Sequence, residues 1–207
     1  HALEGRCLGM VFSKASTRTR ISFEVACFHL GMHPIFMTQD QIQMGRGEPV
    51  ADSARIFSSF LDVLVVRTFA HSDVECLAAH GTIPVINALT DLDHPLQALA
   101  DIQTLRGHFG DIQGKRLAYV GAANNVSNAL CSIAPRVGLD LVLVCPEAYG
   151  PDPAWMERCR RFAREAGTRM DVTADLGGVR DAHAVYTDVW ASMGQEAEAE
   201  ARHAILR

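Results

Sequence analysis

Short apolar segments alternate with longer helical segments along the whole chain, and this alternation is the feature that most constrains the fold. It is typical of parallel α/β architecture, in which a helix connects each strand to the next. Eight apolar segments are predicted strands, at 6–12, 33–37, 61–67, 82–87, 116–121, 139–145, 169–173 and 184–189. The predicted helices occupy 19–31, 49–60, 73–81, 95–110, 125–138 and 153–167.

Two local signals support these assignments. In the first helix, Ile21, Val25 and Phe28 recur at helical spacing, and Gly31 offers a stop. The segment HFGDIQGKR, residues 108–116, follows a long helix and precedes a new strand. We therefore predict two doubly wound parallel-sheet α/β lobes, residues 1–108 and 109–207.

Charge and composition exclude several classes of protein. A net charge of -5 and an isoelectric point near 6.0 argue against a nucleic-acid-binding surface but leave room for a local anion pocket. No apolar run approaches the roughly 20 residues of a membrane span, and no signal peptide is visible. The six cysteines form no CxxC pair, which favours reduced core thiols in the cytoplasm over disulfides or zinc.

Ligands of open α/β sheets bind beyond the carboxyl ends of the strands, so the residues that follow each predicted strand are the candidates. The first such stretch is FSKASTRTR, residues 12–20. Ser16 is a plausible N-cap, and the free amides of a helix start favour a phosphate, with hydroxyls from Thr17 and Thr19. Arg18 and Arg20 point about 200° apart on a helix, so we expect one to bind and the other to support the structure. An ordinary capped helix is the alternative.

Two further strand ends carry cations or amides. Arg67 ends the third predicted strand and is either a ligand or a surface ion pair. His94 precedes Pro95, which is favoured at the first position of a helix, and Gln97 follows three residues later. His94 and Gln97 therefore share one edge and could donate to one oxygen, unless His94 only caps its own helix.

The last two strand ends suit an amino acid. Asn124 and Asn125 follow a strand and could bind a carboxylate or simply form a turn; without GxGxxG, a dinucleotide site is poorly supported. Asp188 could hold an ammonium, and the amides of Ser192 and Met193 a carboxylate. The alternative is an aspartate that only forms a cap or turn.

Three motifs, KASTRTR at 14–20, HPLQALAD at 94–101 and DVWASMG at 188–194, resemble the transcarbamylase family in the same order along nearly the whole chain. The last motif is similar to the ornithine branch. Members of this branch transfer the carbamoyl group of carbamoyl phosphate to the side-chain amine of L-ornithine, giving L-citrulline and phosphate in arginine biosynthesis or catabolism. The resemblance implies a site in the cleft between the lobes, a homotrimer or multiple of trimers, and no cofactor or metal.

The resemblance assigns ligands residue by residue. Carbamoyl phosphate is assigned to Ser16, Thr17, Arg18, Thr19, Arg67, His94 and Gln97, together with Gln43, at a position that reaches the site of an adjacent subunit. Among these, Arg18, Arg67 and His94 are the expected catalytic residues, because they can stabilise charge on the carbonyl oxygen and the leaving phosphate. The ornithine end is assigned to Asn125, Asp188, Ser192 and Met193.

The chemistry and the family pattern leave open points. The nucleophile must be an uncharged amine, whose ordinary pKa is near 10.4, and no general base stands out, so phosphate itself is the candidate proton acceptor. Ala122 stands where the family usually has aspartate, so the polar link at that turn is expected to differ. The family's His-Cys-Leu-Pro motif and a later arginine are absent from these 207 residues.

The first helix and a C-terminal part of the family pattern are also missing, so we expect a longer natural chain. If 207 residues were the natural length, a carbamoyl-phosphate-binding module without turnover would be the better interpretation. Within the enzyme class, the alternative is a transcarbamylase that uses acetylornithine, putrescine or aspartate.

Overall fold

The computed structural model describes residues 2–189 and divides the chain into two compact units, His1–Leu96 and Gln97–Arg207. Each unit contains a four-stranded parallel sheet with helices, which confirms the predicted pair of parallel α/β lobes. The division falls earlier than the predicted boundary at 108/109. Helix α4 (Pro95–Phe109) is grouped with the second unit because Ala98 and Ile102 are buried in that unit's core.

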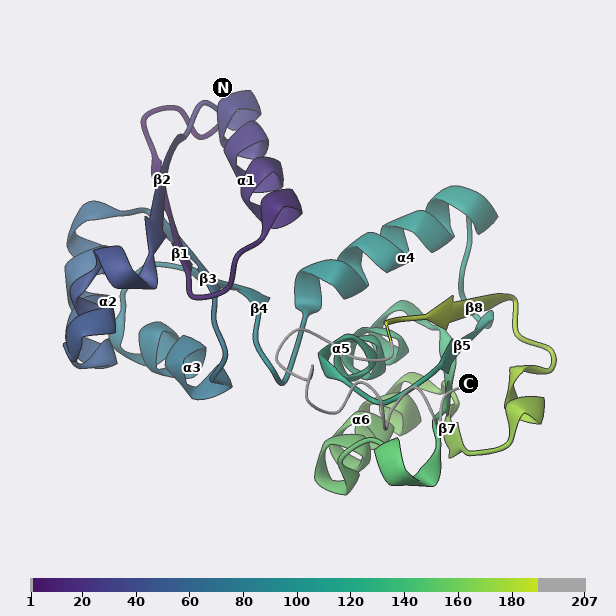
Figure 1. Ribbon diagram of the computed structural model, residues 1–207. Helices are drawn as coiled ribbons and strands as arrows, with labels where there is room; N and C mark the ends of the chain where they lie inside the picture. The colour runs from purple at the N-terminus through teal and green to yellow at the C-terminus, as the bar shows by residue number, and fades with distance from the viewer. Residues whose placement is uncertain (1, 190–207) are drawn as a thin grey trace. The chain divides into compact units, whose positions relative to one another are not determined.

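The first unit is built on strands β1 (Cys7–Phe12), β2 (His33–Thr38), β3 (Val63–Arg67) and β4 (Val85–Leu89), in the order β2-β1-β3-β4. Its helices are α1 (Thr17–Leu30), α2 (Val50–Phe60) and α3 (His71–His80), and the 3-10 turns η1 (Gln39–Gln41) and η2 (Gln43–Arg46) follow β2. Figure 1 shows this unit with labels.

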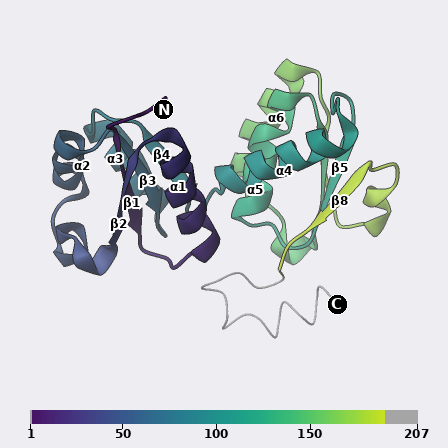
Figure 2. The ribbon, with the colours of Figure 1, turned by 90° about the horizontal axis from the view of Figure 1, so that it is seen from above.

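Both faces of this sheet are covered, which explains why its strands read as nearly continuous apolar runs. On one face Met10 and Val65 pack in a cluster with Cys27 of α1. On the other face Val11 and Val66 belong to a cluster completed mainly by α2 and α3. In Figure 2, α1 accordingly lies on one side of the strands, with α2 and α3 on the opposite side.

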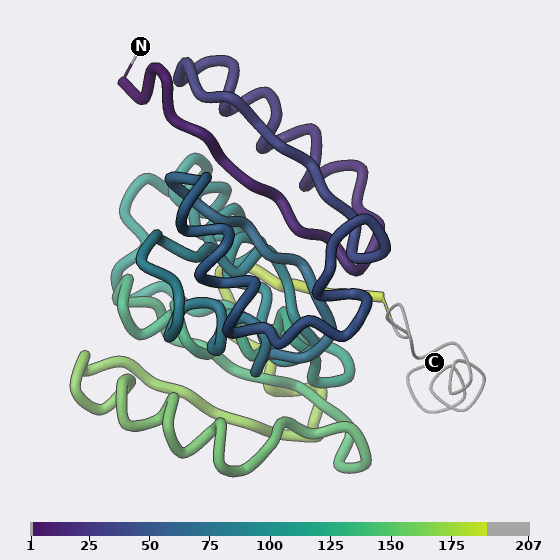
Figure 3. The backbone as a smooth tube through the Cα atoms, turned by 90° about the vertical axis from the view of Figure 1, so that its left-hand side faces the viewer, coloured from purple at the N-terminus to yellow at the C-terminus, as the bar shows by residue number. Residues whose placement is uncertain are grey.

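Helix α1 does not bury the stripe that its sequence pattern suggests. It runs alongside β1, as the purple part of the tube in Figure 3 shows, and turns Cys27 toward the core. Ile21, Val25 and Phe28 are 54%, 46% and 78% exposed. The predicted stop is confirmed: Gly31 caps the helix with φ 80°, in the left-handed region that favours glycine.

The second unit is built on β5 (Arg116–Val120), β6 (Asp140–Val144), β7 (Met170–Thr173) and β8 (Ala184–Thr187), in the order β7-β6-β5-β8. Besides α4 it has helices α5 (Asn125–Ile133) and α6 (Pro153–Ala166). Three 3-10 turns complete it: η3 (Pro135–Val137), η4 (Glu147–Tyr149) and η5 (Leu176–Val179).

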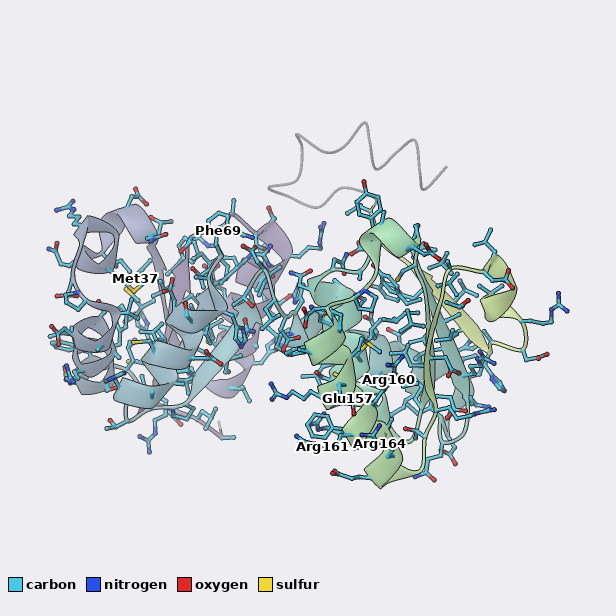
Figure 4. The ribbon with its side chains drawn as sticks, turned by 90° about the horizontal axis from the view of Figure 1, so that it is seen from below. Met37, Phe69, Glu157, Arg160, Arg161 and Arg164 are labelled. Atoms are coloured by element: carbon cyan, nitrogen blue, oxygen red, sulfur yellow. The ribbon has the colours of Figure 1, made fainter. Side chains whose placement is uncertain are left out.

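Helices α4, α5 and α6 cover one face of this sheet (Figure 2) and bury its largest core. The Trp155 Nε1 donates to the carbonyl of Asn128 at 3.3 Å, which joins α6 to α5. The outer side of α6 carries exposed charges, four of which are labelled in Figure 4: Glu157, Arg160, Arg161 and Arg164. On the opposite face, a small cluster including Val142 and Val144 packs against Val179 of η5.

The strand orders place one switch point in each sheet. Strand β1 lies between β2 and β3, and β5 lies between β6 and β8. The chain passes from β1 outward to β2 and from β3 outward to β4, and in the second sheet it passes from β5 outward to β6 while β8 lies on the other side of β5. Ligands of open α/β sheets bind beyond the carboxyl ends of the strands at such points, here β1/β3 and β5/β8. The fold therefore defines two edges at which binding residues should be sought.

Candidate functional site

The loop between β1 and α1 forms the first of these edges. Ser16 is the N-cap of α1, as predicted: its Oγ accepts from the Thr19 backbone N–H at 3.4 Å and lies 2.9 Å from the Thr19 Oγ1. Thr17 and Arg18 are exposed in the first turn. The helix start thus presents hydroxyls, backbone amides and the positive end of the helix dipole together, an arrangement that favours an anion.

A large open pocket of about 820 Å³ adjoins this loop. It is lined by residues 12–17, by Arg20 and Ile21, by Phe36 and Thr38 of β2, and by the segment after β2, including Gly45. The pocket therefore extends from the loop toward β2, whereas Arg67 lies at the end of β3, on the other side of β1. Loop 13–17 is the feature common to the pocket and to the switch point.

Arg20 and Arg18 differ in their surroundings. The Arg20 Nε donates to Glu24 at 2.8 Å, and the guanidinium lies 3.9 Å from the centre of the Phe36 ring. These contacts fix Arg20 in place beside the pocket that it lines, and they fit the supporting role expected of one of the two arginines. Arg18 is exposed at the helix start and stays the predicted ligand.

Arg67 is not the surface ion pair that was the alternative interpretation. It ends β3 with only 5% of its surface exposed, and burial lowers the pKa of its guanidinium. Its Nε is buried and has no hydrogen-bond partner among residues 2–189. Its carbonyl accepts from the Ser13 N–H at 2.8 Å, which joins the end of β3 to the loop after β1.

Lys14 makes a link that the sequence reasoning missed. Its Nζ lies 2.5 Å from the Asp91 Oδ1 and 4.2 Å from the centre of the Phe69 ring, and its side chain is only 9% exposed. Phe69 is labelled in Figure 4. Asp91 belongs to the loop between β4 and α4 that also carries His94. A lysine directly after a strand was the available signal, but its partner lies 77 residues away.

The turn before α4 is fixed by its own hydrogen bonds. The Thr90 N–H donates to the Asp93 carbonyl at 2.9 Å, and the Asp93 N–H donates to the Thr90 Oγ1 at 3.1 Å. His71 at the start of α3 places its Nδ1 3.0 Å from the same hydroxyl. His94 follows this turn and precedes Pro95, which is the first residue of α4, as predicted.

The remaining carbamoyl phosphate candidates lie on α4 and in η2. Gln97 is in the first turn of α4, and its Nε2 donates to the Asp101 Oδ1 at 2.9 Å. Gln43 begins η2 with an exposed side chain. Neither lines the pocket beside the β1–α1 loop.

The switch point of the second unit brings Asn124 and Asp188 together. Asn124 caps α5, its Oδ1 accepting from the backbone N–H groups of Val126 and Ser127 at 2.9 and 3.1 Å. Its Nδ2 donates to the Asp188 Oδ2 at 2.8 Å, and the Asp188 Oδ1 accepts from the Val189 N–H at 2.8 Å. Sequence reasoning selected Asn125, the first residue of α5, and did not foresee that Asn124 would orient Asp188.

Two phenols and a second carboxylate surround this pair. Tyr119 and Tyr186 stack with ring centres 5.9 Å apart, and burial raises the pKa of both. For Tyr186, burial with the nearby charges of Asp101 and Asp188 raises the pKa to about 12. Burial, with a smaller contribution from Asp188, also raises the pKa of Asp101. The surroundings of Asn124 and Asp188 are therefore electronegative and half-buried.

Ala122, the departure from the family pattern, is buried in the turn after β5. The Tyr119 hydroxyl donates to its carbonyl at 2.8 Å, so a backbone group makes the polar link at this turn. Ser192 and Met193 lie outside the described residues. Within residues 2–189 no helix is long and apolar enough to cross a membrane, and no group of three or more His, Cys, Asp or Glu side chains could hold a metal ion.

Fold and site define a two-unit parallel α/β protein with an anion-binding helix start in one unit and an amide–carboxylate pair in the other. Two family profiles match the chain: "Aspartate/ornithine carbamoyltransferase, carbamoyl-P binding domain" at residues 1–107 and "Aspartate/ornithine carbamoyltransferase, Asp/Orn binding domain" at residues 113–207. The chain belongs to the aspartate/ornithine carbamoyltransferase family.

Relatives agree with this assignment. The ornithine carbamoyltransferase of Methanothermobacter thermautotrophicus is 48% identical over 99% of this chain and 68% of its own length. The anabolic ornithine carbamoyltransferase of Pyrococcus furiosus is 47% identical over 99% of this chain and 65% of its own. The solved structure of the P. furiosus enzyme covers 100% of this chain and 66% of its own, with a TM-score of 0.94 and 46% identity. The chain thus spans about two thirds of the length of these relatives.

Proposed function

We propose that the protein transfers the carbamoyl group of carbamoyl phosphate to the side-chain amine of L-ornithine, giving L-citrulline and phosphate. The observation that carries the proposal is the position of four candidate residues at the ends of strands. Ser16 follows β1 and Arg67 ends β3, the two strands that form one switch point, and Asn124 and Asp188 follow the two strands that form the other. Each family domain thus has its predicted ligands at the edge where its sheet binds ligands.

For carbamoyl phosphate, the proposal assigns the phosphoryl group to the start of α1 and to Arg18. Free backbone amides and the hydroxyls of residues 16, 17 and 19 suit its oxygens. Arg67 and His94 are assigned to the carbonyl oxygen, on which negative charge grows in the tetrahedral species. The buried Arg67 Nε, which has no partner among residues 2–189, is a donor already desolvated for such a charge.

For ornithine, the proposal assigns the α-ammonium to Asp188 and the carboxylate to Asn125, Ser192 and Met193. The Asn124 amide holds one oxygen of Asp188 in place before any substrate binds. The side-chain amine must be uncharged when it attacks, and a phosphate oxygen of the bound carbamoyl phosphate is the assigned acceptor of its proton. This assignment requires no metal and no cofactor.

The proposal also covers the metabolic direction, the cellular compartment and the oligomeric state. We assign the biosynthetic direction because a 47% identical relative is named anabolic. All six cysteines are free, four of them buried, which suits the reducing cytoplasm. A homotrimer, or a multiple of trimers, with Gln43 serving the adjacent subunit, is carried over from the family resemblance.

The test is citrulline formation by the intact natural protein from carbamoyl phosphate and a panel of amines: ornithine, acetylornithine, putrescine and aspartate. We expect turnover with ornithine alone. Asp188→Ala should raise the KM for ornithine by about 10- to 100-fold through loss of a charge-assisted hydrogen bond, with the KM for carbamoyl phosphate changed by less than about twofold. Asp171→Ala, an exposed aspartate on β7, is the matched control.

If the enzyme preferred another amine of the panel, that amine would be assigned as the acceptor in place of ornithine. Unchanged ornithine kinetics in Asp188→Ala would remove Asp188 from the site. Binding of carbamoyl phosphate without any turnover would support the non-catalytic module instead.

A further inference from the structure

We propose that Asp101 is a positioning residue that fixes the orientation of the Gln97 side-chain amide, so that the enzyme selects a carbamoyl group over an acyl group lacking the amino function. The inference rests on the proposed function, because it takes Gln97 as a ligand of carbamoyl phosphate. It adds a role for Asp101, a residue that the motif reasoning left without one.

The geometry starts from two residues one helical turn apart. Gln97 and Asp101 are separated by four positions on α4, so their side chains meet on one face of a rigid element. The Gln97 Nε2 donates to the Asp101 Oδ1 at 2.9 Å. Within residues 2–189 the Gln97 Oε1 accepts no hydrogen bond. One end of the amide is thus held, and the other is left for a ligand.

The chemistry of the pair decides which end is held. An ionised carboxylate only accepts hydrogen bonds, whereas an amide carries both a donor and an acceptor. Asp101 can therefore bind only the NH2 end of Gln97, which turns the carbonyl oxygen outward. An asparagine at position 101 would bind either end and would leave both orientations available.

An outward carbonyl oxygen can accept a hydrogen bond from the NH2 of the carbamoyl group. The carbamoyl group carries an NH2 with two donors, and acetyl phosphate has a methyl group of similar size in the same place. The Gln97 oxygen accepts a hydrogen bond from the NH2 of carbamoyl phosphate. Beside the methyl group of acetyl phosphate it loses its water and gains no hydrogen bond in return. Discrimination by this oxygen requires that the amide not rotate, which is the role assigned to Asp101.

The surroundings of Asp101 argue against a purely structural role. Its Oδ2 is buried and makes no hydrogen bond within residues 2–189, and burial together with the charge of Asp188 disfavours the ionised form. An asparagine would satisfy the same helix position at a lower desolvation cost. The carboxylate offers what asparagine does not, a side chain that only accepts hydrogen bonds.

The test compares Asp101→Asn with the wild-type protein, again as the intact natural chain. Affinities for carbamoyl phosphate and acetyl phosphate are measured by the protection each gives against thermal unfolding, and turnover is measured separately. We expect the ratio of the two affinities to fall by about fivefold, the equivalent of one hydrogen bond. The matched control Asp171→Asn should keep the wild-type ratio.

A double-mutant cycle with Gln97→Leu separates positioning from a general structural effect. Gln97→Leu should itself abolish the discrimination, and Asp101→Asn should then have no further effect, because the amide that it positions is gone. An unchanged ratio in a folded Asp101→Asn protein, or an equal loss in both backgrounds, would overturn the proposal.

The proposal can still be decided if the Asp101→Asn variant does not fold or if the wild type forms no citrulline. If Asp101→Asn does not fold, retained discrimination in Gln97→Leu alone overturns the proposal. If the wild type binds carbamoyl phosphate more tightly than acetyl phosphate but forms no citrulline, the proposed function fails while the role of Asp101 can still be decided by binding.

Discussion

Arg67 is a charged side chain held in the core of the first unit without full hydrogen bonding. Its exposed fraction is 5%, and burial lowers its pKa, so folding gains little from the charge. A buried ion without complete partners is weak support for stability. In the proposed function, carbamoyl phosphate supplies the missing hydrogen-bond partner when it binds.

Arg67→Met tests this separation of stability from binding. Because methionine fills a similar volume without a charge, we expect the free energy of unfolding to be unchanged or raised by about 1 kcal/mol. Carbamoyl phosphate affinity should fall about 100-fold through the lost charge-assisted contact. Urea unfolding and ligand titration measure the two quantities, with Arg55→Met, at an exposed ion pair with Asp52, as the control. A strongly destabilised Arg67→Met would mean that the charge is needed for folding.

At the scale of elements, the sequence predicts the strands and helices themselves, but it does not predict which distant segments they pack against. The eight strands and the caps at Ser16 and Gly31 depend on neighbouring residues, and the structure contains all of them, with some strand ends shifted, as in β4, which begins at Val85 instead of residue 82. Helix α4 was predicted, but the unit that it joins depends on where Ala98 and Ile102 pack. The stripe on α1 shows the same limit, because periodicity defines an apolar face without saying what covers it.

For the candidate site too, the sequence predicts some features and not others. Strand ends in the sequence pointed to Arg67 and Asp188, because ligand positions follow from parallel topology. The burial of Arg67 and the hydrogen bond from Asn124 to Asp188 could not be read from it, since each joins segments far apart in the chain. Lys14 and Asp91 belong to this group of distant pairs.

The ion pair of Lys14 with Asp91 should join the β1–α1 loop to the β4–α4 loop. A double-mutant cycle of Lys14→Met and Asp91→Asn should give a coupling free energy of about 0.5–1 kcal/mol, measured by urea unfolding. The value is modest because the Asp91 side chain is 62% exposed. It should decrease at 1 M salt, where the screening length falls to about 3 Å. Additive single effects would show that the two loops are held independently.

At the scale of the whole molecule, each unit has its own core and its own candidate binding edge, while all three tyrosines lie in one unit. Tyr119, Tyr149 and Tyr186 all fall in Gln97–Arg207. The raised pKa values of Tyr119 and Tyr186 mean that the folded state holds these protons more tightly than the unfolded state does. Their contribution to stability is therefore complete below the unfolded pKa, near 10, and is lost as the pH rises through the folded values.

Tyr186→Phe should make alkaline unfolding less steep. In the wild type the free energy of unfolding should fall between pH 10 and the folded pKa of Tyr186, about 12. The variant loses the part of this dependence that Tyr186 contributes, because phenylalanine has no proton to release, whereas Tyr119 keeps its own part. The free energies of unfolding of the two proteins should run parallel between pH 7 and 9. Urea unfolding monitored by circular dichroism across this range gives the slopes. Identical slopes above pH 10 would exclude Tyr186 as a contributor.

The distribution of aromatic residues makes the two units unequal as sources of optical signal. Both tryptophans, at 155 and 190, and all three tyrosines belong to the second unit, and the first unit has only phenylalanine as an aromatic residue besides histidine. Intrinsic fluorescence excited at 280 nm therefore originates in the second unit, and the first unit contributes almost none of it. Phe36→Trp, at the wall of the pocket beside the β1–α1 loop, would supply the missing reporter.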